Sequence, residues 1–412
     1  MSNPWFCCND KVLEINNVEK AIKLDKGSLY QADISDNKVY KWTKVIAKDP
    51  LVAIKNFWKE NVKEKQAIML GYFSYDFAGY IEPKVLDQRD SIINFPEFYF
   101  LTSSQFKFCK RNSSNILEAK PKAANQNSNL IKAHLHNLIL DTEYKRLINE
   151  AIEYISQGAI YEINLSRPML FQLKEEIEHP DFAQLLMKNN PAPYSAYLPL
   201  EKKRSHTLSI CSSSPECFLR KTGQEVSTFP IKGTRPKFND KTKDKLMTQE
   251  LLNSKKEQAE HLMVVDLERN DLGRVAIPSS VKVLKYAELN SFNHIHHLIS
   301  EINCIMKPNL DVFDLIRASF PSGSVTGAPK IRTMQIIREL EPYPRSVYTG
   351  SMGFIDSQGD CEFSVLIRTC LLENNKLLLN VGGGIVWDSE PEMENEETYI
   401  KARSVLNRLT NW

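Results

Sequence analysis

Three apolar segments near the C-terminus constrain the fold more than any other part of the sequence. They are VYTGSMGFI (347–355), CEFSVLIRTCLL (361–372) and KLLLNVGGGIV (376–386), and the turns DSQGD and ENN join them. Connections this short link antiparallel neighbours, because parallel strands need a crossover of a dozen or more residues. The pattern therefore predicts three consecutive antiparallel strands that form a meander.

The first of these turns also predicts which residues face each other. A turn centred on Gln358 pairs Tyr348 with Arg368 across the two strands and places glycines 382–384 of the third strand near Arg368. Glycines at these positions permit the backbone to come close to a bound group, because no Cβ intervenes. A β-bulge is the alternative explanation for the same glycines.

The composition places the chain among globular proteins. Its 412 residues are 42% hydrophobic and 25% charged, and the formal net charge is +2. This length and composition allow one large domain or two ordinary ones, and they exclude a disordered chain. The balanced charge provides no global field for binding nucleic acid or an anionic membrane.

Compartment signals indicate the cytoplasm. No apolar run approaches the roughly 20 residues that span a bilayer, and the first residues, MSNPWFCCND, lack the basic and apolar regions of a signal peptide. The cysteines are scattered without zinc-binding spacing, which is typical of reduced thiols. We therefore expect a cytoplasmic protein.

A polar segment divides the chain into two parts. Residues 110–130 are rich in Asn, Ser and Lys and predict a surface linker between an N-terminal part, 1–109, and a C-terminal catalytic region, 131–412. Just after the linker, apolar residues at helical spacing predict a helix over 141–158. Alternation then predicts a strand over 159–167, with its odd-numbered residues on one face and its even-numbered residues on the other.

Two further predicted helices each carry a pair of glutamates three residues apart. The pairs are Glu257 with Glu260 in the helix over 255–274, and Glu394 with Glu397 in the helix over 389–409. Residues at this spacing share a helix face. Facing carboxylates on two helices supply the oxygen ligands that Mg²⁺ prefers, so the set is a candidate magnesium site. Each pair taken singly is more typical of a solvated helix face.

A glycine-rich segment precedes another predicted helix. In PSGSVTGAPKIRTMQIIRELE (321–341), Gly323 and Gly327 stand ahead of Pro329 and the helix. Such a loop presents free backbone N–H groups, which suit a carboxylate or a phosphate. It is not a nucleotide-binding P-loop, because the Gly-Lys-Ser/Thr ending is missing. A helix cap with flexible glycines explains the segment equally well.

Lys232 lies among apolar residues in FPIKGTRPK (229–237). A lysine at the end of a buried strand loses hydration, which disfavours the ammonium and makes the free amine available as a nucleophile. From this segment alone, an exposed lysine at a strand end is the simpler alternative.

Seven motifs occur together in a single order. They are SSSPECF (212–218), FPIKGTRP (229–236), EHLMVVDLERNDLGRV (260–275), PSGSVTGAPKIRTM (321–334), YTGSMGFID (348–356), FSVLIRT (363–369) and GGGIVWDSEPEMENEETYIKA (382–402). In these motifs the chain closely resembles the chorismate-utilising enzymes over about residues 141–410, whereas the N-terminal third resembles them weakly. The resemblance implies an α/β (α+β) fold, a large four-layer sandwich of two packed antiparallel sheets with helices outside.

The residue between Ile and Gly in the PIxGT motif separates activities within that family. Members of the common aminodeoxychorismate-forming type carry a lysine there, as this chain does at Lys232, whereas anthranilate-forming members carry a small residue. The resemblance implies an enzyme that aminates chorismate at C4 for p-aminobenzoate and folate synthesis, with anthranilate formation as the alternative. Isochorismate- and salicylate-forming members use a lysine at the position of Glu162, where aminating members often have glutamine.

The resemblance also implies roles for individual residues. Lys232 would be the nucleophile and Glu216 the acid. Mg²⁺ would be bound by Glu260 and Glu397, with Glu257 and Glu394 in support. The substrate, chorismate, would contact Thr234, His297, Tyr348, Arg368, Gly382, Gly383, Gly384 and Lys401. No amidotransferase triad is recognisable in this chain, and the family precedent for the ammonia source is a heterodimer with a glutamine amidotransferase (glutaminase) subunit.

Overall fold

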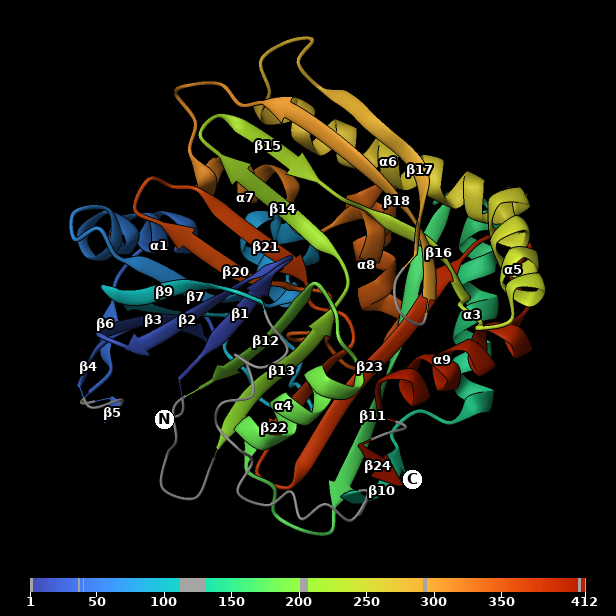
Figure 1. Ribbon diagram of the computed structural model, residues 1–412, viewed down its shortest axis with the longest axis horizontal. Helices are drawn as coiled ribbons and strands as arrows, with labels where there is room; N and C mark the ends of the chain where they lie inside the picture. The colour runs from blue at the N-terminus through green and yellow to red at the C-terminus, as the bar shows by residue number, and fades with distance from the viewer. Residues whose placement is uncertain are drawn as a thin grey trace.

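A computed structural model covers the chain and describes residues 3–35, 38–39, 41–111, 131–200, 207–291, 295–406 and 409–411. Most of the predicted linker at 110–130 lies outside these ranges. Within them the polypeptide forms two large β-sheets flanked by helices (Figure 1).

Hydrogen bonds between neighbouring strands define the order of each sheet. The first sheet contains β24 (Thr410–Asn411), β10 (Ile131–Asn137), β11 (Glu162–Leu173), β23 (Lys376–Ile385), β22 (Thr369–Glu373), β13 (Leu208–Ser214), β12 (Tyr194–Pro199), β1 (Trp5–Cys8), β2 (Lys11–Asn17) and β9 (Gln105–Lys110), with β19 (Gly327–Ala328) beside β11. The second sheet contains β16 (Ile231–Pro236), β18 (Ile295–Ile305), β15 (Glu225–Thr228), β14 (Cys217–Thr222), β21 (Cys361–Val365), β20 (Ser351–Asp356), β7 (Ile68–Phe73), β8 (Phe98–Ser103), β3 (Lys20–Asp25), β4 (Ser28–Ser35) and β5 (Lys38–Val39), with β17 (Lys282–Ser291) beside β18 and β6 (Thr43–Val45) beside β4.

Helices connect and cover the sheets. The α-helices are α1 (Pro50–Trp58), α2 (Ala78–Ile81), α3 (Asp141–Ser156), α4 (His179–Asn189), α5 (Lys241–Asn253), α6 (Lys255–Val275), α7 (Val312–Ser319), α8 (Lys330–Leu340) and α9 (Pro391–Leu406). The shorter helical turns are η1 (Lys59–Lys63), η2 (Tyr75–Phe77), η3 (Pro83–Val85) and η5 (Gly323–Val325).

Three large buried clusters of the described residues lie between four layers. Between the sheets, residues of the first sheet such as Phe6 share a cluster with residues of the second such as Leu70. On the outer face of the first sheet, α4 and α9 pack over strands β11, β22 and β23. On the outer face of the second sheet, apolar residues of α1, α7 and α8 form the largest cluster. This arrangement confirms the predicted fold class.

Strands of the N-terminal part are interleaved with those of the catalytic region. β1 pairs with β12 in the first sheet, and β7 pairs with β20 in the second. Residues on both sides of the predicted linker therefore share both sheets and two of the large buried clusters.

Both hairpins of the predicted meander are present, because β20 pairs antiparallel with β21 and β22 pairs antiparallel with β23. The predicted middle strand, 361–372, is wrong, because it is divided between the two sheets. β20 and β21 pair with Ser351 opposite Val365 and Met352 opposite Ser364, which is the register that a turn centred on Gln358 requires. The chain then leaves the second sheet, because β22 and β23 belong to the first. Arg368 lies at this crossing with φ of 50°, a conformation that ends a strand. The apolar run concealed the crossing, since both strands are buried on two faces.

The strand predicted over 159–167 is also displaced. β11 begins at Glu162 and continues to Leu173. Ile163 and Leu165 are buried on one face as the alternation predicted, whereas Tyr161 precedes the strand and is 68% exposed. The preceding helix is confirmed, since α3 covers Asp141–Ser156.

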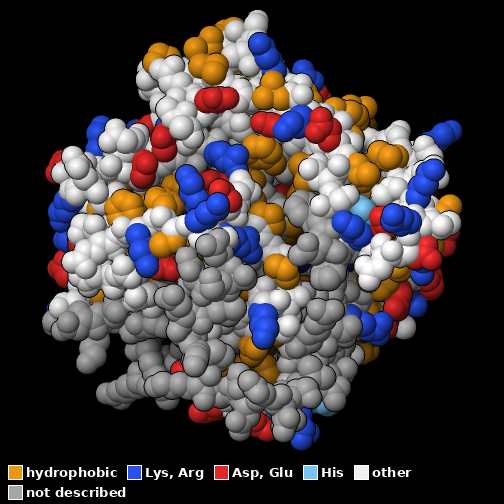
Figure 2. Space-filling model, in the orientation of Figure 1, with side chains coloured by type: hydrophobic (Ala, Val, Ile, Leu, Met, Phe, Trp, Pro, Cys, Tyr) orange, Lys and Arg blue, Asp and Glu red, His pale blue; other side chains and the backbone are white. Residues whose placement is uncertain are grey.

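The charged surface and the free cysteines agree with the balanced charge and the reduced thiols that the sequence predicts. Lys and Arg side chains intermingle with Asp and Glu over the face in Figure 2, without a large area of one sign. All eight cysteines are free, and all but Cys109 are buried. In the ranges that the structure describes, each helix is too short or too polar to cross a membrane.

Phe73 is the centre of an aromatic cluster, and its removal should destabilise the fold. It is fully buried on β7, with ring centroids 4.9 Å from Phe77 and 4.8 Å from Phe100. We expect Phe73→Ala to lower the free energy of unfolding by about 3–5 kcal/mol, because a cavity replaces the ring. Denaturant unfolding measures the loss. Ile46→Ala, at a side chain that is 97% exposed, is the control and should change stability by less than about 0.5 kcal/mol.

Candidate active site

Lys232 joins the two sheets. It lies on β16 of the second sheet, and its Nζ donates a hydrogen bond of 2.5 Å to Oε1 of Glu162 on β11 of the first sheet. The same Nζ lies 4.0 Å from Oε2 of Glu260 on α6. The Lys232 side chain is 10% exposed, so the alternative of an exposed strand-end lysine is wrong.

The sequence predicted an uncharged amine at Lys232, and the raised pKa of Lys232 in the structure contradicts this prediction. Burial alone would lower the pKa of Lys232, as the sequence predicted. The carboxylates of Glu162 and Glu260 and the hydrogen bond to Glu162 outweigh burial, so the pKa is raised above its ordinary value. The sequence could not reveal this, because Glu162 and Glu260 approach Lys232 from two other elements.

The four predicted glutamates lie on two helices, and each has a basic neighbour. The helices α6 and α9 confirm those predicted from the glutamate spacing. The carboxylate-to-cation distances are 3.1 Å for Glu257 and Arg235, 4.0 Å for Glu260 and Lys232, 3.3 Å for Glu394 and Lys256, and 2.6 Å for Glu397 and Lys401. Glu260 and Glu394 are buried, so one glutamate of each pair is shielded from solvent, whereas Glu397 is 48% exposed.

The glutamates fit a divalent cation in their chemistry. Burial raises the pKa of Glu260 to about 7, and Lys232, which acts in the opposite direction, does not cancel this effect. Partial desolvation raises the pKa of Glu397, but Lys401 and Lys256 outweigh it and hold the pKa below its ordinary value, at a side chain that is 48% exposed. Among the described residues, no three acidic, histidine or cysteine side chains already converge as a metal site. A cation would therefore replace basic side chains as the partner of these carboxylates.

The glycine run of β23 lies beside these charged groups. A Cβ on Gly384 would stand 2.7 Å from Oε1 of Glu162 and 3.3 Å from Nζ of Lys232. A Cβ on Gly383 would stand 3.5 to 3.6 Å from Glu394, Lys401 and Glu397, and one on Gly382 would stand 2.4 Å from the Leu165 carbonyl oxygen. The run pairs with β11 without a register shift, so it is not a β-bulge.

Glu216 is buried between β13 and β14. It is 3% exposed, and burial raises the pKa of its carboxyl to about 7. The neighbouring Glu268 raises it further, while Ser324 and Lys232 act in the opposite direction. Arg368 also faces Glu216, and burial lowers the pKa of this arginine although Glu216 opposes the change.

Thr234, His297 and Lys401 lie around the same charged groups. The Thr234 hydroxyl lies 2.9 Å from Nδ1 of His297 across the paired strands β16 and β18. Burial lowers the pKa of His297 to about 4, and Arg368 adds to this effect. Lys401 donates a hydrogen bond of 2.8 Å to the Gly382 carbonyl oxygen. The structure therefore brings all three near the glycine run or Arg368.

Tyr348 is placed differently from its prediction. It lies in the turn before β20, so the cross-strand pair with Arg368 is wrong. Its ring lies 6.0 Å from the guanidinium of Arg345, which forms a buried ion pair of 2.7 Å with Glu341. Burial raises its pKa above the ordinary value. In the described part of the chain, no hydrogen bond joins Tyr348 to Arg368.

Sequence reasoning did not predict that Glu162 pairs with Lys232, that Lys256 pairs with Glu394, or that Glu268 is buried. Glu268 on α6 is completely buried, although its side chain is ionisable. A signal was present, because Glu268 lies between Val264 and Leu272 in the apolar stripe of that helix. A charge within such a stripe requires a buried partner.

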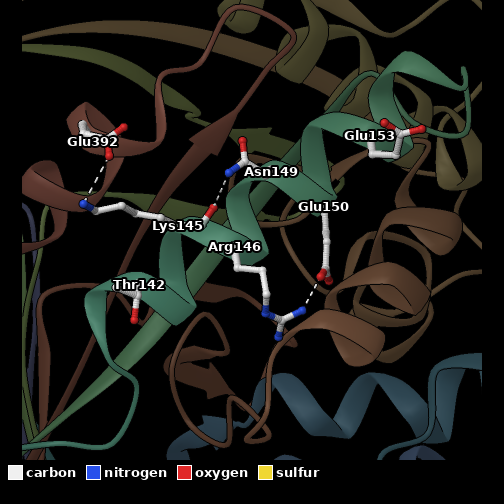
Figure 3. A pocket seen from close by; sticks show the side chains of 7 residues that line it. All are labelled: Thr142, Lys145, Arg146, Asn149, Glu150, Glu153 and Glu392. Atoms are coloured by element: carbon white, nitrogen blue, oxygen red, sulfur yellow. Dashed lines mark hydrogen bonds and ion pairs between the residues drawn. The ribbon is translucent and has the colours of Figure 1, made fainter.

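The surface hollow in Figure 3 is separate from this site. Its lining residues come from α3 and the start of α9: Thr142, Lys145, Arg146, Asn149, Glu150, Glu153 and Glu392. They include an exposed ion pair of 3.2 Å between Lys145 and Glu392. None of the predicted site residues lines the hollow, so we do not assign it to the chemistry.

Comparisons with known proteins agree with this geometry. The family model described as chorismate binding enzyme matches residues 15–407. Anthranilate synthase component 1 of Saccharolobus solfataricus is 35% identical over 345 residues, which cover 83% of this chain and 80% of that protein. Aminodeoxychorismate synthase component 1 of Salmonella typhimurium is 42% identical over 269 residues, which cover 65% of this chain and 58% of that protein. The solved anthranilate synthase component I of Streptococcus pneumoniae has a TM-score of 0.79 and 27% identity, over 96% of this chain and 92% of that chain.

The two-sheet fold, the charged site and these matches define the class of protein: the chain belongs to the chorismate binding enzyme family. The match begins at residue 15 and so includes most of the N-terminal part, where the motifs were weak. The relatives divide between aminodeoxychorismate synthases and anthranilate synthases, and membership of the family does not decide between the two products.

Gly384 should tolerate no side chain. We expect Gly384→Ala to reduce chorismate turnover by on the order of tenfold or more, because its Cβ would displace Glu162 and Lys232 from their hydrogen bond. Steady-state turnover measures the effect, with thermal unfolding as a check on folding. Gly273→Ala on α6 is the matched control, because a Cβ there meets nothing within 4 Å. Equal activity of the two variants would contradict the prediction.

Proposed function

We propose that this chain converts chorismate and ammonia to 4-amino-4-deoxychorismate, as component 1 of an aminodeoxychorismate synthase. The observation that carries the proposal is the buried amine of Lys232, 2.5 Å from Glu162 and beside the glycine run. Family members of this type carry a lysine at that position, and the Salmonella relative of that name is 42% identical. A buried amine is a nucleophile that anthranilate-forming members lack.

Glu216 would protonate the departing hydroxyl at C4. Hydroxide is a poor leaving group, and an acid near the pH of reaction converts it to water. The carboxyl of Glu216 suits this role, because burial raises its pKa to about 7.

Lys232 would form and then break a covalent bond to the ring. Its ammonium must first lose a proton, and the Glu162 carboxylate at 2.5 Å is placed to accept it. The amine adds at C2 as the C4–O bond breaks and water leaves. Ammonia then adds at C4 as the C2–N bond breaks, which returns the amine and leaves the enolpyruvyl group in place.

Mg²⁺ and basic side chains would hold the dianionic substrate. Glu260 and Glu397, supported by Glu257 and Glu394, would bind Mg²⁺, which when bound neutralises the ring carboxylate of chorismate. The second carboxylate would be held by cationic and polar side chains around the glycine run. Arg368, Lys401, Thr234, His297 and Tyr348 would contribute the side chains, and Gly382, Gly383 and Gly384 would contribute backbone close to the substrate.

A glutaminase subunit would supply the ammonia. The relatives from Saccharolobus and Salmonella are each named component 1, which supports a second component. We propose a heterodimer in which the partner hydrolyses glutamine and this chain consumes the ammonia.

Anthranilate synthesis is the second candidate, because the Saccharolobus relative and the Streptococcus structure carry that name. That reaction eliminates pyruvate, so fluorescent anthranilate and free pyruvate from chorismate and ammonium would decide for it.

Removal of the amine should abolish the proposed product. We expect purified protein with chorismate, ammonium and Mg²⁺ to give 4-amino-4-deoxychorismate by mass spectrometry, and Lys232→Ala to reduce it by on the order of a hundredfold or more. Lys65→Ala, at an exposed lysine far from β16 in sequence, is the control and should keep its activity. Unchanged turnover of Lys232→Ala would exclude the covalent route.

The pH profile should report the acid. Because the pKa of Glu216 is about 7, the proton that it donates is present below pH 7 and is lost above. We expect kcat to fall as pH rises through about 7. Glu216→Gln should lower kcat by about 10²–10⁴-fold and lack this dependence. The pH range to measure lies on both sides of the Glu216 pKa of about 7. A wild-type kcat that is constant from pH 6 to pH 9 would contradict the assignment of Glu216 as the acid.

A further inference from the structure

Arg167 is a buried cation on the same strand as Glu162. It lies on β11, and its side chain is 1% exposed. Its guanidinium carbon lies 5.3 Å from the ring centroid of Tyr144 and 5.0 Å from that of Tyr399. Arg167 has no part in the proposed reaction. A charge buried to this degree is tolerated only where hydrogen bonds and a counter-charge compensate for lost hydration, so its partners show what it holds in place.

The guanidinium of Arg167 holds one flank of α9. Nη1 donates a hydrogen bond of 2.8 Å to Oδ1 of Asn395, and Nη2 donates one of 3.2 Å to the Tyr399 hydroxyl. Asn395 and Tyr399 are four residues apart on α9, so both bonds reach the same flank of the helix. Two bonds from a strand to one flank restrict the rotation of the helix about its own axis.

A second pair of bonds fixes the guanidinium itself. Nη1 also donates to Oδ1 of Asp141 at 2.8 Å, and Nη2 also donates to the Ile139 carbonyl oxygen at 3.2 Å. The Tyr399 hydroxyl donates to the same Asp141 oxygen at 2.8 Å, which closes a ring of hydrogen bonds. Each proton on the two nitrogens therefore has an acceptor. A lysine has a single nitrogen and cannot reproduce this planar arrangement.

The other flank of α9 carries the glutamates of the site. A Cβ on Gly383 would stand 3.5 Å from Oε2 of Glu394 and 3.6 Å from Oε1 of Glu397, so both carboxylates lie against the glycine run. That run pairs with β11, the strand of Arg167. One pair of strands therefore holds α9 on both flanks. Rotation of the helix would break the bonds of Arg167 and carry the carboxylate of Glu397 away from the glycine run.

We propose that Arg167 is a positioning residue that fixes the rotation of α9 and thereby places Glu397 for a divalent cation. In the described structure its hydrogen bonds go to Asn395, Tyr399, Asp141 and Ile139 rather than to a glutamate, so it acts through the helix. The inference rests on the proposed function in taking Glu397 as a ligand of Mg²⁺. It does not depend on which product the enzyme forms.

Direct binding of Mn²⁺ measures this effect without turnover. The electron paramagnetic resonance signal of free Mn²⁺ is lost on binding, so a titration of the full chain with chorismate and without ammonia gives a Kd. We expect Arg167→Lys, which keeps the charge, to raise this Kd by about tenfold or more, the usual effect of removing a group that orients a metal ligand. Asn395→Leu keeps the size of the side chain and should raise the Kd by a smaller factor. Thermal unfolding checks that both variants fold.

Arg220→Lys is the matched control. Arg220 on β14 also has a carboxylate, a phenol hydroxyl and an aromatic ring as partners, at 2.8 Å from Glu362, 3.2 Å from Tyr194 and 4.9 Å from the ring centroid of Phe229. None of these three partners belongs to α9. We expect this variant to unfold at a lower temperature than the wild type and to keep its Kd for Mn²⁺. If the Kd rises equally in Arg220→Lys and Arg167→Lys, a general loosening explains both and the proposal is overturned.

The dependence of turnover on Mg²⁺ gives a second readout. In Arg167→Lys the half-saturating Mg²⁺ concentration should rise by about the same factor as the Kd, while kcat at saturating Mg²⁺ stays within about threefold of the wild type. A damaged fold would instead lower kcat at every Mg²⁺ concentration.

The binding titration also separates this inference from the proposed reaction. If the protein makes no 4-amino-4-deoxychorismate but Arg167→Lys alone weakens Mn²⁺ binding, the proposed function fails and the inference stands. If the product forms and Arg167→Lys and Asn395→Leu bind Mn²⁺ as tightly as the wild type, the function stands and the inference fails. A wild-type chain that binds no Mn²⁺ would overturn the inference as well.

Discussion

An ion pair between the two sheets is the constraint on which the site depends. Lys232 comes from the second sheet and Glu162 from the first, and their charged atoms lie 2.5 Å apart. Both side chains are nearly excluded from solvent. Loss of one partner would leave a buried charge without compensation, which costs about 3–5 kcal/mol. The two charges are therefore tolerated only where the sheets meet in this one relative position.

The same first-sheet strand organises the other buried charges. Along β11, Ser166 donates to Glu341, which pairs with Arg345, and Arg167 pairs with Asp141 at 2.8 Å. These bonds attach β11 to α3 and to the end of α8. The glycine run of β23 pairs with the edge of β11 that faces away from β10. The active-site groups are thus held on rigid elements rather than on mobile loops. A metal ion and a dianionic substrate would exchange partners with existing ion pairs rather than enter an uncharged cavity.

Much of the site could be predicted from residues that carry their own local signal. The glutamate pairs lie on the helices that their spacing indicated, because periodicity is a property of one segment. The register of the β20–β21 hairpin followed from the position of its turn. Arg368 was misplaced, since its backbone leaves the strand region at a crossing between sheets that an apolar run does not mark. Tyr348 was paired wrongly for the same reason.

The sequence alone determined the family, the elements that carry the glutamates and the need for glycine at 382–384, since each depends on residue types at fixed local spacing. Tertiary structure alone decided the raised pKa values of Lys232 and Glu216 and the hydrogen bonds that the buried Glu268 accepts. The physical reason is that a pKa depends on the groups within a few ångströms. For these residues, those groups come from strands, helices and loops that are distant in the chain or belong to the opposite sheet, and only packing brings them together.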